Sequence, residues 1–587
     1  MVEPGGRPGL TGRPGLPRRR CAILLGAMFL AFGGVSFRLV QLQVVQPEAH
    51  AERGVAQRLR SVDLPAQRGS IFDRNGHELA MSVSQHTVWA DPRAVVDAEA
   101  TARVLAPVLE LPPGEVVERL GDGEARFVYL ARQIDPERAA AVEDLELAGI
   151  NLREEPKRFR PSGRLAGGVV GEVDVDGTGV SGLELQYDDR LSGESGELMV
   201  ERGAEGETIA GGQRRLRPAV RGEDLVLSLD RSLQYEAEQA LSRQVAATGA
   251  KGGMAVVMDP RQGDVLAMVA VTDTDDGPRP TANNPTLTDV FEPGSVTKVA
   301  TLAGVVEEGL AGPDDVAAVP DSLRVGPKIF TDSTPHEPEL MTTSDILGQS
   351  SNVGTITLAR QLGERGLAEY LQRFGFGQPT GLDFPGESAG ILPPVESWSG
   401  TSIGSLAIGQ GIAVNAVQML GALNVVANGG MSTPPRLVRA VVDDQGEERA
   451  VAPGEASRVI SAGTAEQLGA MLEDAVESGT GVNAGIEGFR VAGKTGTARK
   501  PSSTFRGYVE GAYTSVFAGY VPAQDPRLSV IVVLDEARPF YGGVVAAPVF
   551  AEIAEHGLRL LGVPPTEAPP AAPVEVGPSA DGVMTQD

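Results

Sequence analysis

One apolar stretch near the N-terminus constrains this chain more than any other sequence feature. The seventeen residues Cys21–Phe37 carry no charged side chain and directly follow three arginines. At 1.5 Å per residue, a helix of that length spans about 25 Å, close to the thickness of a bilayer core, and Leu39–Val45 can extend it to the interface. We therefore predict a membrane helix over residues 21–45 and a polar body that folds on one side of the membrane.

The arginines set the orientation expected for this helix. Because basic residues favour the cytoplasmic side, residues 1–20 are predicted to be a cytoplasmic tail and everything after residue 45 to be extracytoplasmic, held at the cell membrane by a single pass. A cleaved signal peptide is the alternative, although no A-x-A cleavage pattern follows the apolar stretch. A lipid anchor on Cys21 is disfavoured because arginines, rather than apolar residues, precede it.

Charge and cysteine content exclude several classes of protein. The net charge is −27, and five arginines against Glu3 give residues 1–20 a charge of +4, which leaves −31 for the rest. An acidic body without a basic stripe argues against a nucleic-acid partner. Cys21 is the only cysteine, and the five histidines have no ligand-like spacing. Neither a disulfide framework nor a metal site is therefore expected, and we predict no cofactor.

A chain of 587 residues is too long for one hydrophobic core, so several domains are expected. Residues 46–64 are predicted to be a polar helical connector, and residues 46–215 together a spacer or docking module, with an Asn75-Gly76 turn after a short apolar strand. Residues 216–562 form the next predicted domain. The Pro/Ala-rich residues 563–587 are predicted to be a disordered tail.

The predicted fold of residues 216–562 is α/β, with a sheet flanked by helices. Strand-like segments occur near both ends of this domain, and helical segments lie between them. The predicted strands are 254–258, 265–271, 515–520 and 528–534, with another at Lys494–Thr497. The predicted helices are 231–246, which Asp230 can cap, and then 343–349, 353–362, 414–427, 464–478 and 548–561.

Ser295 and Lys298 provide the first candidate catalytic pair. They lie at the start of a predicted helix over Ser295–Leu310, and their spacing of three places the two Cβ atoms about 5–6 Å apart on one face. A lysine in a desolvated, cation-rich site can lose its proton and activate the serine as a nucleophile. Only six residues of the chain are lysine, and arginine cannot serve as such a base. Of these lysines, Lys500 is interpreted as a surface residue.

Two further motifs follow in order, Ser350-Ser351-Asn352 and then Lys494-Thr495-Gly496-Thr497. Together with Ser-x-x-Lys they form the signature of serine β-lactamases and penicillin-binding proteins. Ser350 can relay a proton between Lys298 and a leaving amine, and the carboxamide of Asn352 can hold a substrate amide. The Lys494–Thr497 segment offers a cation and hydroxyls to a terminal carboxylate. One of its N–H groups, with that of Ser295, can form an oxyanion hole.

The chain resembles the class B penicillin-binding proteins, and is most similar to the division-specific (septal) peptidoglycan D,D-transpeptidases. The resemblance runs from the membrane segment to about Leu561. It is carried by Arg68–Gly76, Val88–Pro92, Glu292–Lys298, Ser350–Gly354, Gly409–Ile412, Gly493–Thr497, Gly519–Pro526 and Tyr541–Phe550.

The resemblance implies a fold and a set of partners. The fold would be an elongated α+β pedestal (dimerisation) domain followed by a serine-acyltransferase domain with a five-stranded sheet. The donor substrate would be a peptidoglycan stem peptide ending in D-Ala-D-Ala, the acceptor an amine on a neighbouring stem peptide, and β-lactams would acylate Ser295 as inhibitors. A polytopic membrane glycosyltransferase and other division proteins would be partners.

Alternatives remain at this level. A D,D-carboxypeptidase would use water as the acceptor with the same motifs, and a divisome scaffold or β-lactam sensor would use the site little or not at all. The long N-terminal part and the membrane tether favour the transpeptidase and disfavour a secreted β-lactamase. His336, just before the second motif, is open to two interpretations, as a residue lining the cleft or as part of a surface loop.

Overall fold

The computed structural model describes residues 16–41, 59–121, 125–201, 203, 214–502 and 507–566. The chain divides into two compact units, Met1–Pro65 with Ser195–Ala219 and Ala66–Glu194 with Val220–Asp587. Of the predicted terminal segments, residues 1–15 of the cytoplasmic tail and residues 567–587 of the disordered tail lie outside the described residues.

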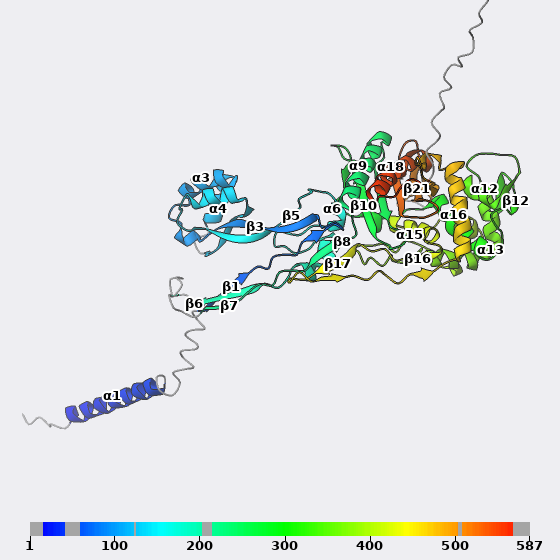
Figure 1. Cartoon of the computed structure of the whole chain (residues 1–587). Coiled ribbons are helices and arrows are strands. Elements are labelled where there is room, and N and C mark those ends of the chain that lie inside the picture. Colours follow the sequence, from blue (N-terminus) through cyan, green and yellow to red (C-terminus); the bar gives the residue numbers. More distant parts are fainter. Residues whose placement is uncertain are drawn as a thin grey trace, which may run out of the picture. The chain divides into compact units, whose positions relative to one another are not determined.

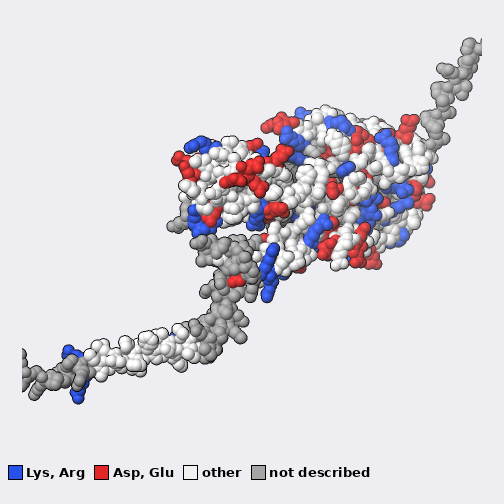
Figure 2. Space-filling model, turned by 60° about the vertical axis from the view of Figure 1, so that its left-hand side comes forward, with Lys and Arg blue, Asp and Glu red and all other residues white. Residues whose placement is uncertain are grey.

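The first unit contains the predicted membrane helix. Helix α1 covers Leu16–Val40, and within it Arg19–Val40 is long and apolar enough to cross a membrane, with a mean hydropathy of 2.0. None of that segment is buried against other residues, and Figure 2 shows its surface almost free of charge between its ends. The predicted extension over residues 42–45 lies outside the described residues.

A small antiparallel sheet completes this unit. Its strand order is β1-β6-β7, with β1 at Leu59–Leu64, β6 at Gly196–Glu201 and β7 at Arg214–Arg217. The prediction that residues 46–64 are helical is therefore wrong for residues 59–64, and residues 46–58 lie outside the described residues. Strand β1 pairs with a segment about 140 residues later in the chain, from Leu59 opposite Glu201 to Leu64 opposite Gly196, and no local pattern reveals such a partner.

A seven-stranded sheet forms one end of the second unit. Its order is β18-β17-β8-β2-β3-β4, and β5 also pairs with β3. Helices α3 (Ala98–Leu109), α4 (Pro113–Leu120) and α5 (Pro136–Glu143) enclose a small core with strands of this sheet. The strands are β2 Ile71–Phe72, β3 Glu78–Ala90, β4 Val128–Ile134, β5 Ile150–Phe159, β8 Asp224–Leu227, β17 Val438–Val442 and β18 Glu448–Ala450.

This sheet draws strands from both sides of the predicted domain boundary at residues 215 and 216. Strand β2 runs parallel to β8, with Ile71 opposite Leu225. The buried Arg68 just before β2 donates hydrogen bonds to Glu184 (2.7 Å) and Asp188 (2.6 Å), in helices α7 (Gly182–Gln186) and α8 (Asp188–Leu191). Residues on the two sides of position 215 thus share one sheet, and the predicted boundary between the two domains stays a prediction.

The second sheet is entirely antiparallel and has the order β11-β10-β9-β22-β21-β20. Its strands β10 and β21 are labelled in Figure 1. The prediction of a central antiparallel sheet flanked by helices is confirmed. The resemblance implied five strands, and the sixth, β11, is a two-residue edge. The strands are β9 Gly252–Met258, β10 Val265–Thr272, β11 Arg279–Pro280, β20 Ala492–Pro501, β21 Tyr508–Val521 and β22 Leu528–Asp535.

Each face of this sheet is covered by helices, because successive side chains of a strand point to opposite faces. Alternate residues of β22, such as Val530 and Val532, lie in a core with helices α9 (Arg231–Thr248) and α18 (Ala547–Leu560). Ile531 and Val533 lie in the other core, with α11 (Lys298–Glu307), α15 (Ala416–Ala427) and α16 (Ala462–Glu477). The middle of the sheet is therefore a buried central layer, while β11 and the first residues of β21 are exposed.

Further short helices and strands lie around these two cores. The helices are α6 Gly167–Val170, α10 Pro285–Thr288, α12 Thr343–Gly348, α13 Asn352–Arg373, α14 Ser402–Leu406 and α17 Gly542–Val545. The paired short strands are β12 Val316–Val319 with β15 Glu339–Thr342, β13 Ser322–Val325 with β14 Lys328–Thr331, and β16 Met431–Ser432 with β19 Ser457–Arg458.

Candidate active site

Ser295 lies in a 3-10 turn, Gly294–Thr297, and the α-helix α11 begins at Lys298. The predicted single helix from Ser295 to Leu310 is therefore divided into two parts and ends earlier, at Glu307. The sharp entry depends on Gly294, whose φ is +55°, a region that favours glycine. Gly409 packs so closely here that a Cβ atom would lie 2.2 Å from the Gly294 carbonyl oxygen.

The Lys298 side chain is fully buried, and its amine lies close to three oxygen atoms of the second motif. Its Nζ donates to the Ser350 carbonyl at 2.5 Å and to the Asn352 Oδ1 at 2.8 Å, and it lies 3.3 Å from the Ser350 Oγ. Burial holds the pKa of Lys298 well below its usual range, and the nearby cation of Lys494 lowers it further, while Asp332 opposes the shift. Lys298 is thereby better suited than an ordinary lysine to act as a base.

The second motif is presented by the junction between α12 and α13. Ser350 has a φ of +62°, which turns its carbonyl and hydroxyl toward Lys298, and the Ser351 side chain caps α13 by accepting from the Gly354 N–H. The carboxamide of Asn352 also donates to the Thr331 carbonyl at 2.9 Å. Bonds to Lys298 and to Thr331 therefore fix the orientation of the Asn352 carboxamide.

Asp332 is a member of the site that the sequence did not reveal. Its carboxylate accepts hydrogen bonds from the Ser351 hydroxyl (2.7 Å), the Val353 N–H (3.0 Å) and the Asn352 N–H. A carboxylate at the N-terminus of α13 is favoured by the helix dipole. Asp332 thus anchors the helix that carries Asn352, from a loop twenty residues earlier in the chain.

The third motif lies on strand β20, beside the Ser295 turn. Lys494 is fully buried, and burial lowers its pKa to about 7. Gly496 packs against that turn, because a Cβ atom there would lie 2.9 Å from the Pro293 carbonyl oxygen. The Thr497 hydroxyl accepts from the Gly542 N–H at 3.1 Å, and the Thr495 hydroxyl pairs with that of Thr480 at 2.7 Å.

The three predicted motifs therefore meet around Ser295. Lys298 is hydrogen-bonded to both Ser350 and Asn352, β20 packs on the Ser295 turn, and Lys494 acts electrostatically on Lys298. Sequence patterns alone missed Asp332, Thr480 and Gly542. The last falls within a segment, Tyr541–Phe550, that carried the family resemblance, but nothing local marked it as a partner of Thr497.

His336 lies behind Asp332 and connects to the site through it. Its Nε2 is 3.1 Å from the Asp332 carboxylate, its Nδ1 is 2.8 Å from the Glu337 carbonyl, and 19% of its side chain is exposed. The Glu337 carbonyl, and then Asp332, raise the pKa of His336 above its usual value. His336 therefore belongs to a loop and contacts Asp332, and a role in lining the cleft stays a prediction.

We predict a pH-dependent stabilisation by His336. Because its folded-state pKa is raised, its contribution is fully present below the ordinary value of about 6.5 and is lost as pH rises through the folded-state pKa. The melting temperature of wild type should therefore exceed that of His336→Gln most at about pH 5.5, and the difference should shrink steadily toward about pH 8.5. His556→Gln, which removes a histidine bonded to Ser232 instead, is the matched control. A difference that does not change with pH would contradict the prediction.

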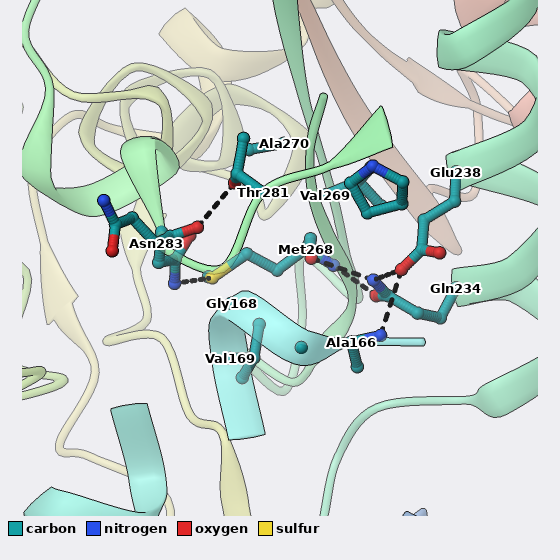
Figure 3. Close-up of a pocket in the computed structure, with 13 residues that line it drawn as sticks. Ala166, Gly168, Val169, Gln234, Glu238, Met268, Val269, Ala270, Thr281 and Asn283 are labelled. Atoms are coloured by element: carbon teal, nitrogen blue, oxygen red, sulfur yellow. Dashed lines mark hydrogen bonds between the residues drawn. The ribbon is translucent and has the colours of Figure 1, made fainter. Parts of the chain in front are cut away.

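A separate small cavity lies away from these motifs (Figure 3). It is enclosed by α6, α9, β10 and the segment around Asn283, and the buried Glu238 accepts hydrogen bonds there from Gln234 (2.9 Å) and the Ala166 N–H (3.0 Å). Its volume of about 10 Å³ is at the lower limit for a single water molecule. This cavity is therefore a packing junction, too small to bind a peptide.

Two protein families match the chain. The family described as "Penicillin binding protein transpeptidase domain" matches residues 253–555, and "Penicillin-binding Protein dimerisation domain" matches residues 63–227. The first range contains all three motifs around Ser295.

Similar proteins cover nearly the whole chain. Penicillin-binding protein PbpB of Mycolicibacterium smegmatis is 35% identical over 90% of this chain and 89% of its own length. Peptidoglycan D,D-transpeptidase FtsI of Escherichia coli K12 is 33% identical over 93% and 92%. The solved structure of penicillin binding protein 3 from Mycobacterium tuberculosis, complexed with aztreonam, is 31% identical with a TM-score of 0.68, covering 86% of this chain and all of that one.

Proposed function

This chain belongs to the class B penicillin-binding proteins, and from that premise we propose that it is a peptidoglycan D,D-transpeptidase of septal wall synthesis that works through a Ser295 acyl-enzyme. The observation that carries the proposal is the fully buried Lys298, bonded to Ser350 and Asn352 and lying one turn after Ser295. A neutral lysine in that position is the base that an attacking serine needs.

The reaction has two halves. In the first, Lys298 takes the Ser295 proton, the Ser295 oxygen attacks the carbonyl of the penultimate D-alanine, and Ser350 relays the proton to the leaving D-alanine. Asn352 aligns the donor peptide, while Lys494 and the hydroxyls of Thr495 and Thr497 hold its terminal carboxylate. In the second half, an amine of a neighbouring stem peptide takes the acyl group.

The close approach of Gly496 to the Ser295 turn supports an oxyanion hole made by backbone N–H groups of Ser295 and β20. Such donors stabilise charge that develops in the transition state, and losing one typically costs about 10²–10³ in rate. The same site accepts β-lactams, whose carboxylate would occupy the Lys494 end and whose ring carbonyl would meet Ser295. The structure of a relative complexed with aztreonam supports the binding of β-lactams.

We also propose roles for the two large domains of the chain. We propose that residues 46–215 are a pedestal domain and residues 216–562 the transpeptidase domain. The pedestal offers a docking surface for a polytopic membrane glycosyltransferase and for other division proteins. A D,D-carboxypeptidase, with water as acceptor, is the second candidate for the same active site, and the acceptor used in solution decides between them.

The function is tested by acylation and by cross-linking. Incubation with a penicillin should give one stable covalent adduct by intact-protein mass spectrometry, and tandem mass spectrometry should place it on the peptide that contains Ser295. The purified protein should then cross-link nascent peptidoglycan and release D-alanine. Rapid turnover of the antibiotic would instead indicate a hydrolase, and hydrolysis of the stem peptide without cross-linking would indicate a carboxypeptidase.

We also propose that α1 spans the membrane with residues 1–20 in the cytoplasm. The basic residues Arg19 and Arg20 at the start of the apolar segment support this orientation. Protease added outside intact spheroplasts should digest the body and leave a small N-terminal fragment in the membrane. Full protection of the body would overturn this orientation, and recovery of a soluble protein without residues 1–40 would indicate a cleaved signal instead.

A further inference from the structure

Glu292 is a buried carboxylate beside the nucleophile that the reaction described above does not use. It lies three residues before Ser295 and is 8% exposed. It accepts hydrogen bonds from the Gly411 N–H (2.9 Å) and from the Tyr508 hydroxyl, whose oxygen is 3.1 Å and 3.3 Å from its two carboxylate oxygens. Gly411 follows α14 and Tyr508 begins β21, so Glu292 connects two segments that are far apart in the chain.

Both hydrogen-bond donors to Glu292 are electrically neutral. Within the described part of the chain, no basic nitrogen lies within 4 Å of its carboxylate. A carboxylate offers about four acceptor positions, and one N–H and one O–H do not fill them. Burial also raises the pKa of Glu292, because removal from water disfavours its charged form. An added cation would therefore be bound favourably here.

Lys328 is the basic residue whose charge acts on Glu292, but its own bonds hold it elsewhere. Its Nζ donates to the Gln410 Oε1 (3.1 Å) and the Ser405 Oγ (3.2 Å), and it lies over the Phe330 ring at 4.4 Å. A ligand that carries both an ammonium and a carboxylate would thus find a complementary charge at each residue. The charge of Lys328 lowers the pKa of Glu292, but the Lys328 amine is bonded to Gln410 and Ser405.

The position of Glu292 along the chain limits its distance from the chemistry. Three residues span at most about 10 Å even when fully extended. The turn at Pro293 and Gly294 is far from extended, with Pro293 in the helical region and a Gly294 φ of +55°. The Cα atoms of Glu292 and Ser295 are therefore less than about 10 Å apart, and Glu292 directly precedes the turn that carries the nucleophile.

We propose that Glu292 binds the ammonium group of the acceptor stem peptide and directs it to the acyl-enzyme. This inference rests on the proposed transpeptidase function, because it concerns the second half of that reaction. The bound ammonium releases one proton to solvent, and its nitrogen then attacks the acyl carbonyl carbon. As the C–N bond forms and the bond to the Ser295 oxygen breaks, a second amine proton passes through Lys298 to that oxygen. The products are an amide, free Ser295 and one proton in solution.

A purely structural role for Glu292 is the competing explanation. The carboxylate would then only connect the segments that contain Tyr508 and Gly411, through its hydrogen bonds to the Tyr508 hydroxyl and the Gly411 N–H. The two roles differ in what the charge does. If Glu292 only holds Tyr508, removing the Tyr508 hydroxyl should have the same effect as neutralising Glu292. If it binds an ammonium, the charge of Glu292 is what matters.

The experiment measures how the acyl-enzyme partitions between an amine and water. The full-length protein is acylated by a thioester analogue of the D-Ala-D-Ala donor in the presence of D-alaninamide, whose only charge is its ammonium group. Mass spectrometry gives the ratio of transfer product to hydrolysis product, which does not depend on how fast the enzyme is acylated. The variants are Glu292→Gln, Glu292→Asp, Tyr508→Phe and, as a matched control on an exposed glutamate, Glu396→Gln.

We expect Glu292→Gln to lower the transfer ratio about 10–100-fold, the range for losing a charge-assisted hydrogen bond. Glu292→Asp should retain an intermediate ratio, while Tyr508→Phe and Glu396→Gln should stay within about threefold of wild type. An unchanged ratio in Glu292→Gln overturns the proposal, and an equal loss in Tyr508→Phe assigns Glu292 the structural role instead. If wild type is acylated by neither the donor nor a penicillin, the proposed function itself fails, a result distinct from both.

Discussion

A Lys298→Arg protein should react with a β-lactam about 10²–10⁴-fold more slowly than wild type, which corresponds to about 3–5 kcal/mol of barrier. Arginine keeps the positive charge but cannot give up its proton near neutral pH, because its pKa lies above 12. Lys298 can, since burial and the nearby Lys494 hold its pKa well below the usual range. The measurement is the second-order rate of acylation by a fluorescent penicillin.

Folding has to be separated from chemistry in this test. Lys298 is fully buried, and overpacking by a larger side chain typically costs about 1–3 kcal/mol, so the melting temperature of Lys298→Arg should fall without loss of the fold. Lys251→Arg makes the same substitution at an exposed lysine paired with Glu536 and should react like wild type. A folded Lys298→Arg protein that reacts within threefold of wild type would show that Lys298 is not the base.

The chemistry of the site was more predictable from the sequence than its supports. Ser295, Lys298, Ser350, Asn352 and Lys494 stand in short motifs whose residue types are dictated by the reaction, so local patterns reveal them. Asp332 has no such pattern, because a single loop aspartate is common and its partners in α13 lie about twenty residues away. The contact between Glu292 and Tyr508 joins residues 216 positions apart, and only the folded chain brings them together.

Local sequence signals also predicted helices where the chain is amphipathic or has a helix-capping residue. Asp230 caps α9 as expected, by accepting from the Ser232 and Leu233 N–H groups. The predicted helix end at Leu362 coincides with a break at Gly363, where φ is +78°, although the element resumes and continues to Arg373. Glycine and helix-capping residues act on the backbone within a few residues, and this explains why such boundaries can be predicted.

The long strands of the N-terminal part could not be predicted in the same way. Strand β5, with the sequence INLREEPKRF, has charged residues at both odd and even positions and only one fully buried side chain. It lacks the alternation that a half-buried strand displays. Its stability comes from pairing along its whole length with β3, from Met81 opposite Phe159 to Ala90 opposite Ile150, and that partner is remote in sequence.

Removal of the Lys494 ammonium should weaken acylation by two separable routes. Lys494→Met deletes the proposed cation for the β-lactam carboxylate, and a hydrogen bond to a charged group is worth about 1.5–3 kcal/mol, or roughly 10–150-fold in rate. It also removes the positive charge that lowers the pKa of Lys298. That pKa should then rise, so that Lys298 stays protonated to a higher pH and the rising limb of the pH–rate profile moves upward.

The pH profile of acylation from about pH 5 to 9 distinguishes these two routes. A matched control is Lys500→Met on the same strand, because Lys500 pairs with Asp535 at 2.7 Å and no hydrogen bond or ion pair of its own in the described structure joins it to the Ser295 motifs. Its rate and its profile should match those of wild type. A slower Lys494→Met protein with an unmoved profile would limit Lys494 to binding the carboxylate. An unmoved profile with a wild-type rate would remove Lys494 from the site, and the low pKa of Lys298 would then have to come from burial alone.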